Sequence, residues 1–119
     1  MLALAFAGGI VLADREVAYP LTRSMCAPIG DGAAAAVLCS ERVLRGLGTR
    51  RAVRVRASVI ASGMDRGEDE PDIAERAAAR AYAQAELGAG EIGLAEVHDA
   101  TAFGELHQTE MLGFCAPGQ

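Results

Sequence analysis

The second half of the chain alternates strand-like and helix-like segments, and this order constrains the fold most. Residues 53–62 place apolar side chains at every second position, which is the period of a half-buried β-strand. Residues 72–87 are rich in alanine and follow Pro71, so they predict a helix that glycines from Gly88 onward end. Residues 94–97 predict a second strand, and another helix follows it. The order predicts a parallel strand pair with a right-handed crossover, and hence an α/β fold class.

The run GAAAAVLCS over residues 32–40 has two interpretations. Its four alanines favour a helix by propensity. The run is short, however, lies between turn-forming residues and ends in Val-Leu-Cys, which suits a strand buried on both faces equally well. The pattern by itself leaves both open.

Three further segments of the first half have local signals. Residues 10–17 predict a short helix, and residues 20–31 have the proline and glycine positions of a loop. Residues 41–47 predict another short helix, with Ser40 as its N-cap and glycines up to Gly48 at its end.

The composition argues against several classes of partner and compartment. A net charge of −5 argues against nucleic acid, which requires a basic face. The three cysteines lack CxxC spacing, so we expect neither a zinc site nor a disulfide framework, and a reducing cytoplasm fits best. The apolar opening lacks a basic start and is too short to span a bilayer, so we expect no signal peptide and no membrane segment. Aromatic residues make up only 4%, so the core is expected to be thin and to gain from neighbouring chain or a dimer partner.

Three stretches together resemble the thiolase family, and most closely its sterol-carrier-protein or lipid-transfer branch. The first is CAPIGDGAAAAVL from Cys26, which is similar to the family's cysteine, proline and Asp-Gly-Ala-Ala-Ala run. The second is the alanine-rich helix that ends before Gly88, with its approach to the next strand. The third is VHDATAFGELHQTEMLGFCAPG from Val97 to Gly118, at the spacing of the branch's His-Asp-Cys-Phe, Asn-Glu-Leu and Tyr-Glu-x-Leu-Gly-x-Cys motifs. The resemblance covers nearly the whole chain from about residue 11.

The resemblance implies a thiolase-like fold of two similar α/β lobes. Residues 32–40 are then a buried strand of the first lobe. Residues 1–48 are expected to be the end of the N-terminal lobe, and residues 52–119 the start of the C-terminal lobe with its first βαβα unit. Because family chains are several-fold longer, the sequence is expected to be an internal fragment.

The resemblance also implies a function, that of an acyl-CoA acyltransferase carrying out thioester Claisen condensation or thiolytic cleavage in lipid metabolism or lipid transfer. His98 is expected to be the catalytic residue of this stretch, as a donor in the oxyanion hole for the thioester carbonyl. A coenzyme A thioester would be the substrate, with no covalently bound cofactor and no metal. A homodimer of the full-length parent is implied, with a partner subunit as the alternative.

The chain departs from the family in ways that leave other functions open. Ala100, Thr101 and Gly104 stand where the branch commonly has Cys, Phe and Asn, so the pocket beside His98 differs. The family's nucleophilic Cys-x-Ser loop, Gly-His-Pro histidine and late Cys-x-Gly motif do not occur. We therefore expect the fragment to be inactive alone. The alternatives are an aldolase subunit that cleaves side-chain acyl-CoA, or a non-catalytic binding or dimerisation module.

Each candidate residue also has a structural interpretation. His98 is alternatively a strand-end histidine held by a backbone carbonyl. Asp99 could orient His98 or bind substrate, but a helix cap is favoured, a role that Thr101 also suits. Glu105 is expected to be solvated or to support the cap, and His107 to lie at the surface. Cys39 is expected to be buried as a small hydrophobe. None of the cysteines is assigned catalysis: Cys26, Cys39 and Cys115.

Overall fold

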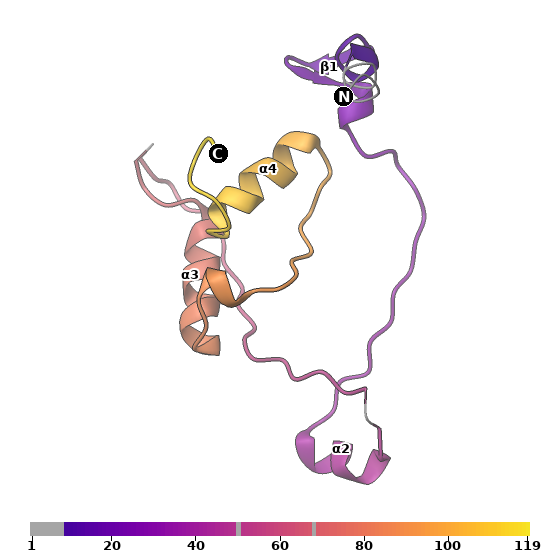
Figure 1. Ribbon diagram of the computed structural model, residues 1–119, viewed down its shortest axis with the longest axis vertical. Helices are drawn as coiled ribbons and strands as arrows, with labels where there is room; N and C mark the ends of the chain where they lie inside the picture. The colour runs from indigo at the N-terminus through magenta and orange to yellow at the C-terminus, as the bar shows by residue number, and fades with distance from the viewer. Residues whose placement is uncertain (1–8, 50, 68) are drawn as a thin grey trace.

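The computed structural model describes residues 9–49, 51–67 and 69–119, so the apolar opening lies mostly outside the described residues. Figure 1 shows three parts of the chain: an N-terminal hairpin, a helix joined to the rest by long extended segments on both sides, and a pair of neighbouring helices. The elements in chain order are β1 (Glu16–Ala18), β2 (Leu21–Thr22), the 3-10 helix η1 (Arg23–Met25), α2 (Glu41–Leu47), α3 (Ile73–Ala85), the 3-10 helix η2 (Ala89–Glu91) and α4 (Ala102–Met111).

The N-terminal unit is a short antiparallel hairpin of β1 and β2, preceded by a helical turn at residues 9–12. Its buried residue is Thr22, which is 5% exposed and whose hydroxyl donates to the Val11 carbonyl oxygen at 2.7 Å. The predicted helix over residues 10–17 is therefore wrong beyond residue 12, because the segment that follows pairs with β2 instead. The predicted loop over residues 20–31 contains β2 and η1 before it becomes extended.

The run over residues 32–40 forms neither the helix nor the buried strand. Residues 27–40 have no helix or strand assignment and are exposed throughout. Val37, for example, is 92% exposed. The correction has a simple physical reason: a strand requires a neighbour that bonds its backbone, and no segment in the described part of the chain forms a ladder with this run.

Helix α2 confirms the predicted boundaries. Ser40 is its N-cap, and the Ser40 hydroxyl accepts a hydrogen bond from the Val43 amide at 3.4 Å. Gly48 ends the helix in the left-handed conformation, at φ 62°, which a residue with a Cβ adopts only at a cost. The sequence signals suffice here because both caps are local.

Helix α3 lies against the extended segment 56–62, and its side chains bond the backbone of that segment. The Arg80 guanidinium donates to the carbonyl oxygen of Ile60 at 3.3 Å, and the Gln84 side-chain oxygen accepts from the amide of Ser58 at 3.4 Å. The segment therefore has one half-buried face and one exposed face, as its period of two predicts. Its half-buried residues alternate with exposed ones, the half-buried ones being Ala57, Val59 and Ala61.

The predicted parallel strand pair does not form. Neither residues 53–62 nor residues 94–97 are strands in the structure, whose sheet among described residues consists of β1 and β2. The first segment contacts α3 and the second runs separately toward α4 (Figure 1). Each lacks the neighbouring backbone that a sheet requires. The mixed helix and strand content is consistent with the α/β class.

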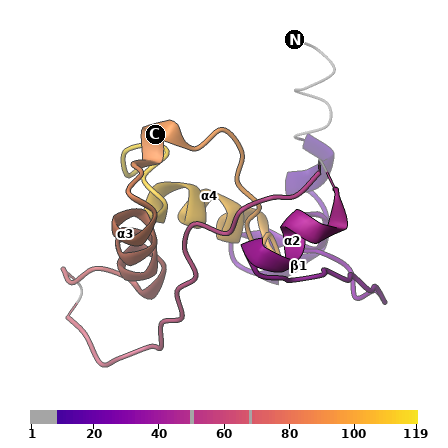
Figure 2. The ribbon, with the colours of Figure 1, turned by 90° about the horizontal axis from the view of Figure 1, so that it is seen from below.

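Helices α3 and α4 lie side by side in both ribbon views (Figures 1 and 2). The Tyr82 hydroxyl of α3 donates to the Leu112 carbonyl oxygen at 2.7 Å, next to the end of α4. Helix α3 was predicted to end near residue 87, but Glu86 already takes the left-handed conformation, at φ 56°. The pair is the part of the chain that positions the candidate site.

The chain is more open than a compact domain of its length. Its radius of gyration is 18.9 Å, against about 13.5 Å for a compact domain of this length. Its accessible surface is 10394 Å², against about 6,100 Å² for a compact protein of this mass. The buried apolar residues in the described ranges are Ala78 and Ala85. This confirms the thin core that the sequence predicts.

Small-angle X-ray scattering of the dilute chain tests this openness. We expect a radius of gyration near 18.9 Å, because the extended segments have no neighbouring strands in the described part of the chain to hold them in a compact sheet. A value near the compact one, about 13.5 Å, would contradict the observed arrangement.

Glycine-to-alanine substitutions at the two glycines of α2 test its C-terminal cap. Gly48→Ala should destabilise the helix by about 1–2 kcal/mol, because the left-handed conformation brings a Cβ too close to the following carbonyl oxygen. Gly46→Ala is the matched control, and it should stabilise the helix by about 0.5–1 kcal/mol, because Gly46 lies inside the helix and its Cβ position is open. Amide exchange at Leu44, which donates to the Ser40 carbonyl oxygen at 2.9 Å, measures both effects.

Candidate functional site

The corner that carries His98 lies between the extended segment 94–97 and α4. Thr101 caps α4, since its hydroxyl accepts a hydrogen bond from the Gly104 amide at 3.0 Å. Asp99 is exposed and is not the cap, so the prediction that it caps α4 is wrong, and Thr101, the other residue suited to the role, is the cap. The reason is position: Thr101 directly precedes the first helical residue, whereas Asp99 lies two residues farther out.

The backbone of His98 is bonded on both sides by one side chain. The Gln108 amide nitrogen donates to the His98 carbonyl oxygen at 2.7 Å, and the Gln108 oxygen accepts from the His98 amide at 3.2 Å. The His98 side chain itself is exposed. The histidine is therefore held through its backbone while its ring lies at the surface.

The N-terminal unit supports the other side of this corner. The Ala27 amide donates to the Ala100 carbonyl oxygen at 2.9 Å, and Cys26 forms an isolated antiparallel bridge with Thr101. The Cys26 thiol donates to the Thr22 carbonyl oxygen at 3.5 Å. Segments more than seventy residues apart in the sequence therefore meet next to His98, a contact that no local pattern predicts.

His107 lines an open cavity beside the start of α3. It is half-buried on α4, and its ring stacks on Phe103 with centroids 5.4 Å apart and planes 12° apart. The cavity has a volume of about 310 Å³. Its remaining lining residues are Arg66, Asp69, Glu70, Pro71, Asp72, Glu75 and Met111. His107 is therefore half-buried rather than fully exposed, and the spacing of Phe103 and His107 by one helical turn is a signal for such a pair.

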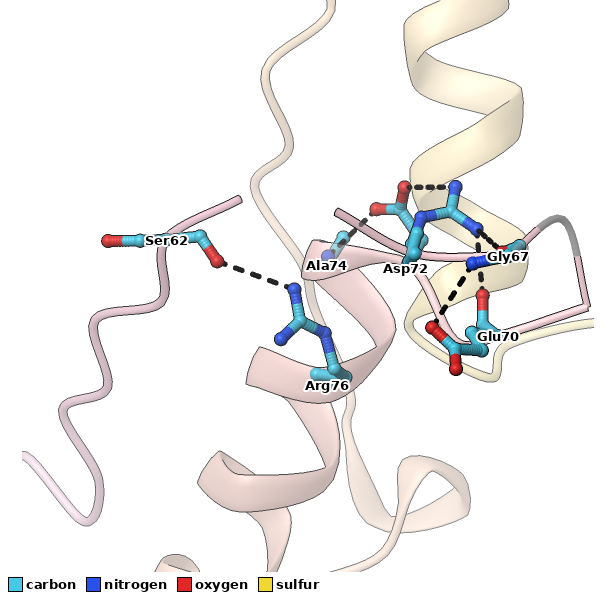
Figure 3. Close-up of polar contacts among 7 residues, drawn as sticks. Ser62, Gly67, Glu70, Asp72, Ala74 and Arg76 are labelled. Atoms are coloured by element: carbon cyan, nitrogen blue, oxygen red, sulfur yellow. Dashed lines mark hydrogen bonds and ion pairs between the residues drawn. The ribbon is translucent and has the colours of Figure 1, made fainter. Parts of the chain in front are cut away.

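Asp72 is the best-bonded carboxylate of this cavity. It caps α3 by accepting from the Ala74 amide at 2.9 Å, and it pairs with the Arg66 guanidinium at 3.3 Å (Figure 3). The amide hydrogen bond from Ala74, and then the positive charges of Arg66, His107 and Arg76, hold the pKa of Asp72 below its ordinary value, against the opposing effect of burial. This carboxylate therefore stays ionised and serves as the N-cap of α3.

The loop before α3 is ordered by a second set of polar contacts. Glu70 accepts from the Gly67 amide at 3.2 Å, and Arg76 donates to the Ser62 carbonyl oxygen at 3.3 Å (Figure 3). Arg76 also points a nitrogen at the Met64 sulfur, 2.8 Å away. The charged loop GMDRGEDEP is thus folded back onto α3 by its own side chains.

The remaining candidate residues lie apart from one another. Glu105 is exposed, as predicted, and Glu110 accepts from the Gly118 amide at 2.8 Å, which holds the C-terminal segment. Cys39 is exposed, so the prediction that it is buried is wrong, because the run that contains it has no covering layer. Cys26 and Cys115 are half-buried.

Two features are absent from the described residues. No helix there is long and apolar enough to cross a bilayer. Within the same ranges, no group of three His, Cys, Asp or Glu side chains is arranged to hold a metal ion.

Comparisons with known proteins agree on one family. Residues 64–119 match the family model described as "Thiolase C-terminal domain-like". The chain is 38% identical over 113 residues to benzoylsuccinyl-CoA thiolase subunit BbsB of Thauera aromatica. The matched region covers 92% of this chain and 29% of the relative. It is 39% identical over 114 residues to acetyl-CoA acetyltransferase of Methanothermobacter thermautotrophicus, which covers 92% of this chain and 30% of the relative.

The lipid-transfer side of the resemblance also has matches. The chain is 33% identical over 118 residues to sterol carrier protein 2 of Homo sapiens, with 92% of this chain and 22% of that protein covered. The chain thus spans less than a third of the length of each of these relatives. No solved structure matches it significantly.

Substitutions of Asp72 test its role as cap and ion-pair partner. Asp72→Ala should cost about 1 kcal/mol at pH 7, because the Ala74 amide loses its acceptor. Asp72→Asn should cost less, since asparagine caps equally well and only the charge is lost. Urea unfolding followed by circular dichroism measures both.

The pH dependence follows from the lowered pKa of Asp72. A carboxylate whose folded pKa is depressed stabilises the fold above its unfolded pKa, and this stabilisation is lost as the pH falls through the folded pKa. Unfolding measured between pH 7 and pH 2 should therefore show a smaller acid loss in Asp72→Asn than in wild type. Asp65→Asn, which removes an exposed charge from the same loop, is the control and should keep the wild-type loss.

Proposed function

Because the chain belongs to the thiolase family, we propose that it supplies one corner of a thiolase-like acyl-CoA acyltransferase site, with His98 as the donor to the thioester carbonyl oxygen. The observation that carries this proposal is the arrangement of His98. Its ring is exposed, while its backbone is bonded on both sides and lies at the start of a capped helix. A donor that is fixed in this way requires little rearrangement when charge develops on the substrate.

The chemistry assigned to His98 is electrostatic. Attack on a thioester carbonyl, or formation of the enolate that a Claisen condensation uses, places negative charge on the carbonyl oxygen. A ring N–H aimed at that oxygen stabilises the charge, and loss of one such donor typically lowers a rate about 100- to 1000-fold. The attacking cysteine and its acid–base partners belong to motifs that this chain does not contain.

We further propose that the chain works as part of a larger thiolase polypeptide. Residues 1–48 would be the end of the N-terminal lobe and residues 52–119 the start of the C-terminal lobe, of which residues 1–8 and 50 and 68 lie outside the described part. The extended segment 53–62 already has α3 on one face, which is how a strand of an α/β lobe is covered. Further strands would then pair with the backbone of this segment.

The substrate of the assembled site would be a coenzyme A thioester, with no covalently bound cofactor. Two of the relatives are named after coenzyme A esters, benzoylsuccinyl-CoA and acetyl-CoA, and these names support this class of substrate. A cytoplasmic location and a homodimer of the full-length parent complete the proposal.

A second candidate is an aldolase subunit that cleaves side-chain acyl-CoA together with a partner. Absence of the Cys-x-Ser loop from an intact parent would favour it, and the relative from Thauera aromatica is itself named as a subunit. A third candidate is a non-catalytic binding or dimerisation module, which the large exposed surface supports. Activity of the assembled protein on a thioester separates the first two candidates from the third.

Titration of the chain with acetoacetyl-CoA, followed by nuclear magnetic resonance, tests the role of His98. The chain has two histidines, so their ring signals serve as internal probe and control. We expect the His98 ring signals to shift and those of His107 to stay. His98→Ala should weaken binding about fivefold, the loss of about 1 kcal/mol expected for one hydrogen bond, while His107→Ala should not. The chain alone should show no thiolytic turnover.

Two results would contradict the proposal. Binding that is equally strong in wild type and His98→Ala would remove the role assigned to His98. Turnover of acetoacetyl-CoA by the chain alone would show that the missing cysteine motifs are not required.

A further inference from the structure

The carboxamide of Gln108 makes three hydrogen bonds at the corner of the candidate site. One amide hydrogen serves the His98 carbonyl oxygen at 2.7 Å, and the other serves the Gly104 carbonyl oxygen at 3.1 Å. The side-chain oxygen accepts from the His98 amide at 3.2 Å. The half-buried Gln108 side chain on α4 thus bonds both the backbone amide and the backbone carbonyl of His98, ten positions earlier in the chain.

We propose that Gln108 is a positioning residue, which sets the orientation of His98 by replacing the strand neighbour that the extended segment before it lacks. The catalytic consequence rests on the proposed function of His98. An amide side chain has a donor and an acceptor side by side, which is the pattern that a neighbouring strand offers to a residue in a hydrogen-bonded pair. It therefore satisfies both backbone groups of His98 where no ladder is present.

The surroundings of Gln108 favour this role. Gly104 has no side chain between α4 and the corner, and a Cβ there would lie 3.4 Å from the His98 carbonyl oxygen and 3.9 Å from the Gln108 nitrogen. The backbone on the far side is fixed separately, by the bond between Ala27 and Ala100 and by the Thr101 cap. Residue 98 is the one position of this corner whose backbone depends on Gln108.

The fixed backbone limits where the His98 ring can go. The direction of the Cα–Cβ bond follows from the backbone dihedrals, and side chains choose among a few staggered rotamers about it. Free rotation of the backbone at residue 98 would spread the ring nitrogens over many directions. With the two hydrogen bonds in place, the Cα–Cβ bond of His98 leaves the corner in a defined direction, which leaves the ring the few rotamers from which an oxyanion donor is chosen.

Two variants of nearly equal volume separate hydrogen bonding from packing. Gln108→Met removes all three hydrogen bonds, and Gln108→Glu keeps the size and acceptor oxygens but cannot donate to either carbonyl at neutral pH. The control is Gln84→Met, which changes a glutamine on the neighbouring helix that bonds Ser58 instead. The readouts are amide exchange at residues 98 and 104, and the shift of the His98 ring signals on titration with acetoacetyl-CoA.

We expect Gln108→Met to lose about tenfold protection at the His98 amide, as removal of a hydrogen bond of about 1.4 kcal/mol implies. Gln108→Glu should keep part of this protection, because its carboxylate still accepts from the His98 amide while both donations to carbonyl oxygens are lost. Protection at Gly104, whose amide donates to Thr101, should persist and show that α4 is intact. The shift of the His98 ring with acetoacetyl-CoA should shrink in both variants and remain in Gln84→Met.

The outcomes separate this inference from the proposed function. Unchanged protection of the His98 amide in both variants would overturn the positioning role. A ring shift as large in Gln108→Met as in wild type would also overturn it, while leaving the function of His98 standing. A third result would be loss of His98 amide protection in the Gln108 variants while acetoacetyl-CoA shifts no His98 ring signal in wild type. It would support the backbone contact and refute the acyl-CoA role of His98.

Discussion

The hydrogen-bonding requirement of extended backbone decides the form of this chain. Segments 32–40, 53–62 and 94–97 are the strand-like parts of the sequence, and in the described residues none of them has a strand beside it. Backbone amides and carbonyls that lack a partner remain in water, which keeps the segments exposed and the chain open. The helices, whose backbone bonds are internal, form without this support.

Side chains partly replace the missing sheet at two places. Along segment 56–62, side chains of α3 bond the carbonyl oxygens and one amide of the extended backbone. At residue 98, the Gln108 carboxamide bonds both backbone groups at once. Both contacts are made from helices α3 and α4, which lie side by side, so the pair carries most of the order in the second half of the chain.

The candidate site has the same dependence on partners. His98 is oriented by contacts from α4, and the corner beside it is supported by residues 26 and 27 of the N-terminal unit. The acidic cavity around His107 and Asp72 is a separate feature, committed to capping α3 and ordering the loop before it. In the proposed acyl-CoA site, this corner would supply the oxyanion donor, and the nucleophile would come from elsewhere in the assembled protein.

The sequence by itself determined what is local. The boundaries and caps of α2, the cap of α4 as an alternative, the helices that follow each extended segment and the family resemblance were all evident from residue type and spacing. The contact of Cys26 with Thr101, the half-buried position of His107 and the Gln108 contact with His98 were not, because each depends on residues whose separation in sequence does not fix their distance in space. Local signals fix a helix and its caps, whereas pairing and burial exist only once tertiary structure brings partners together.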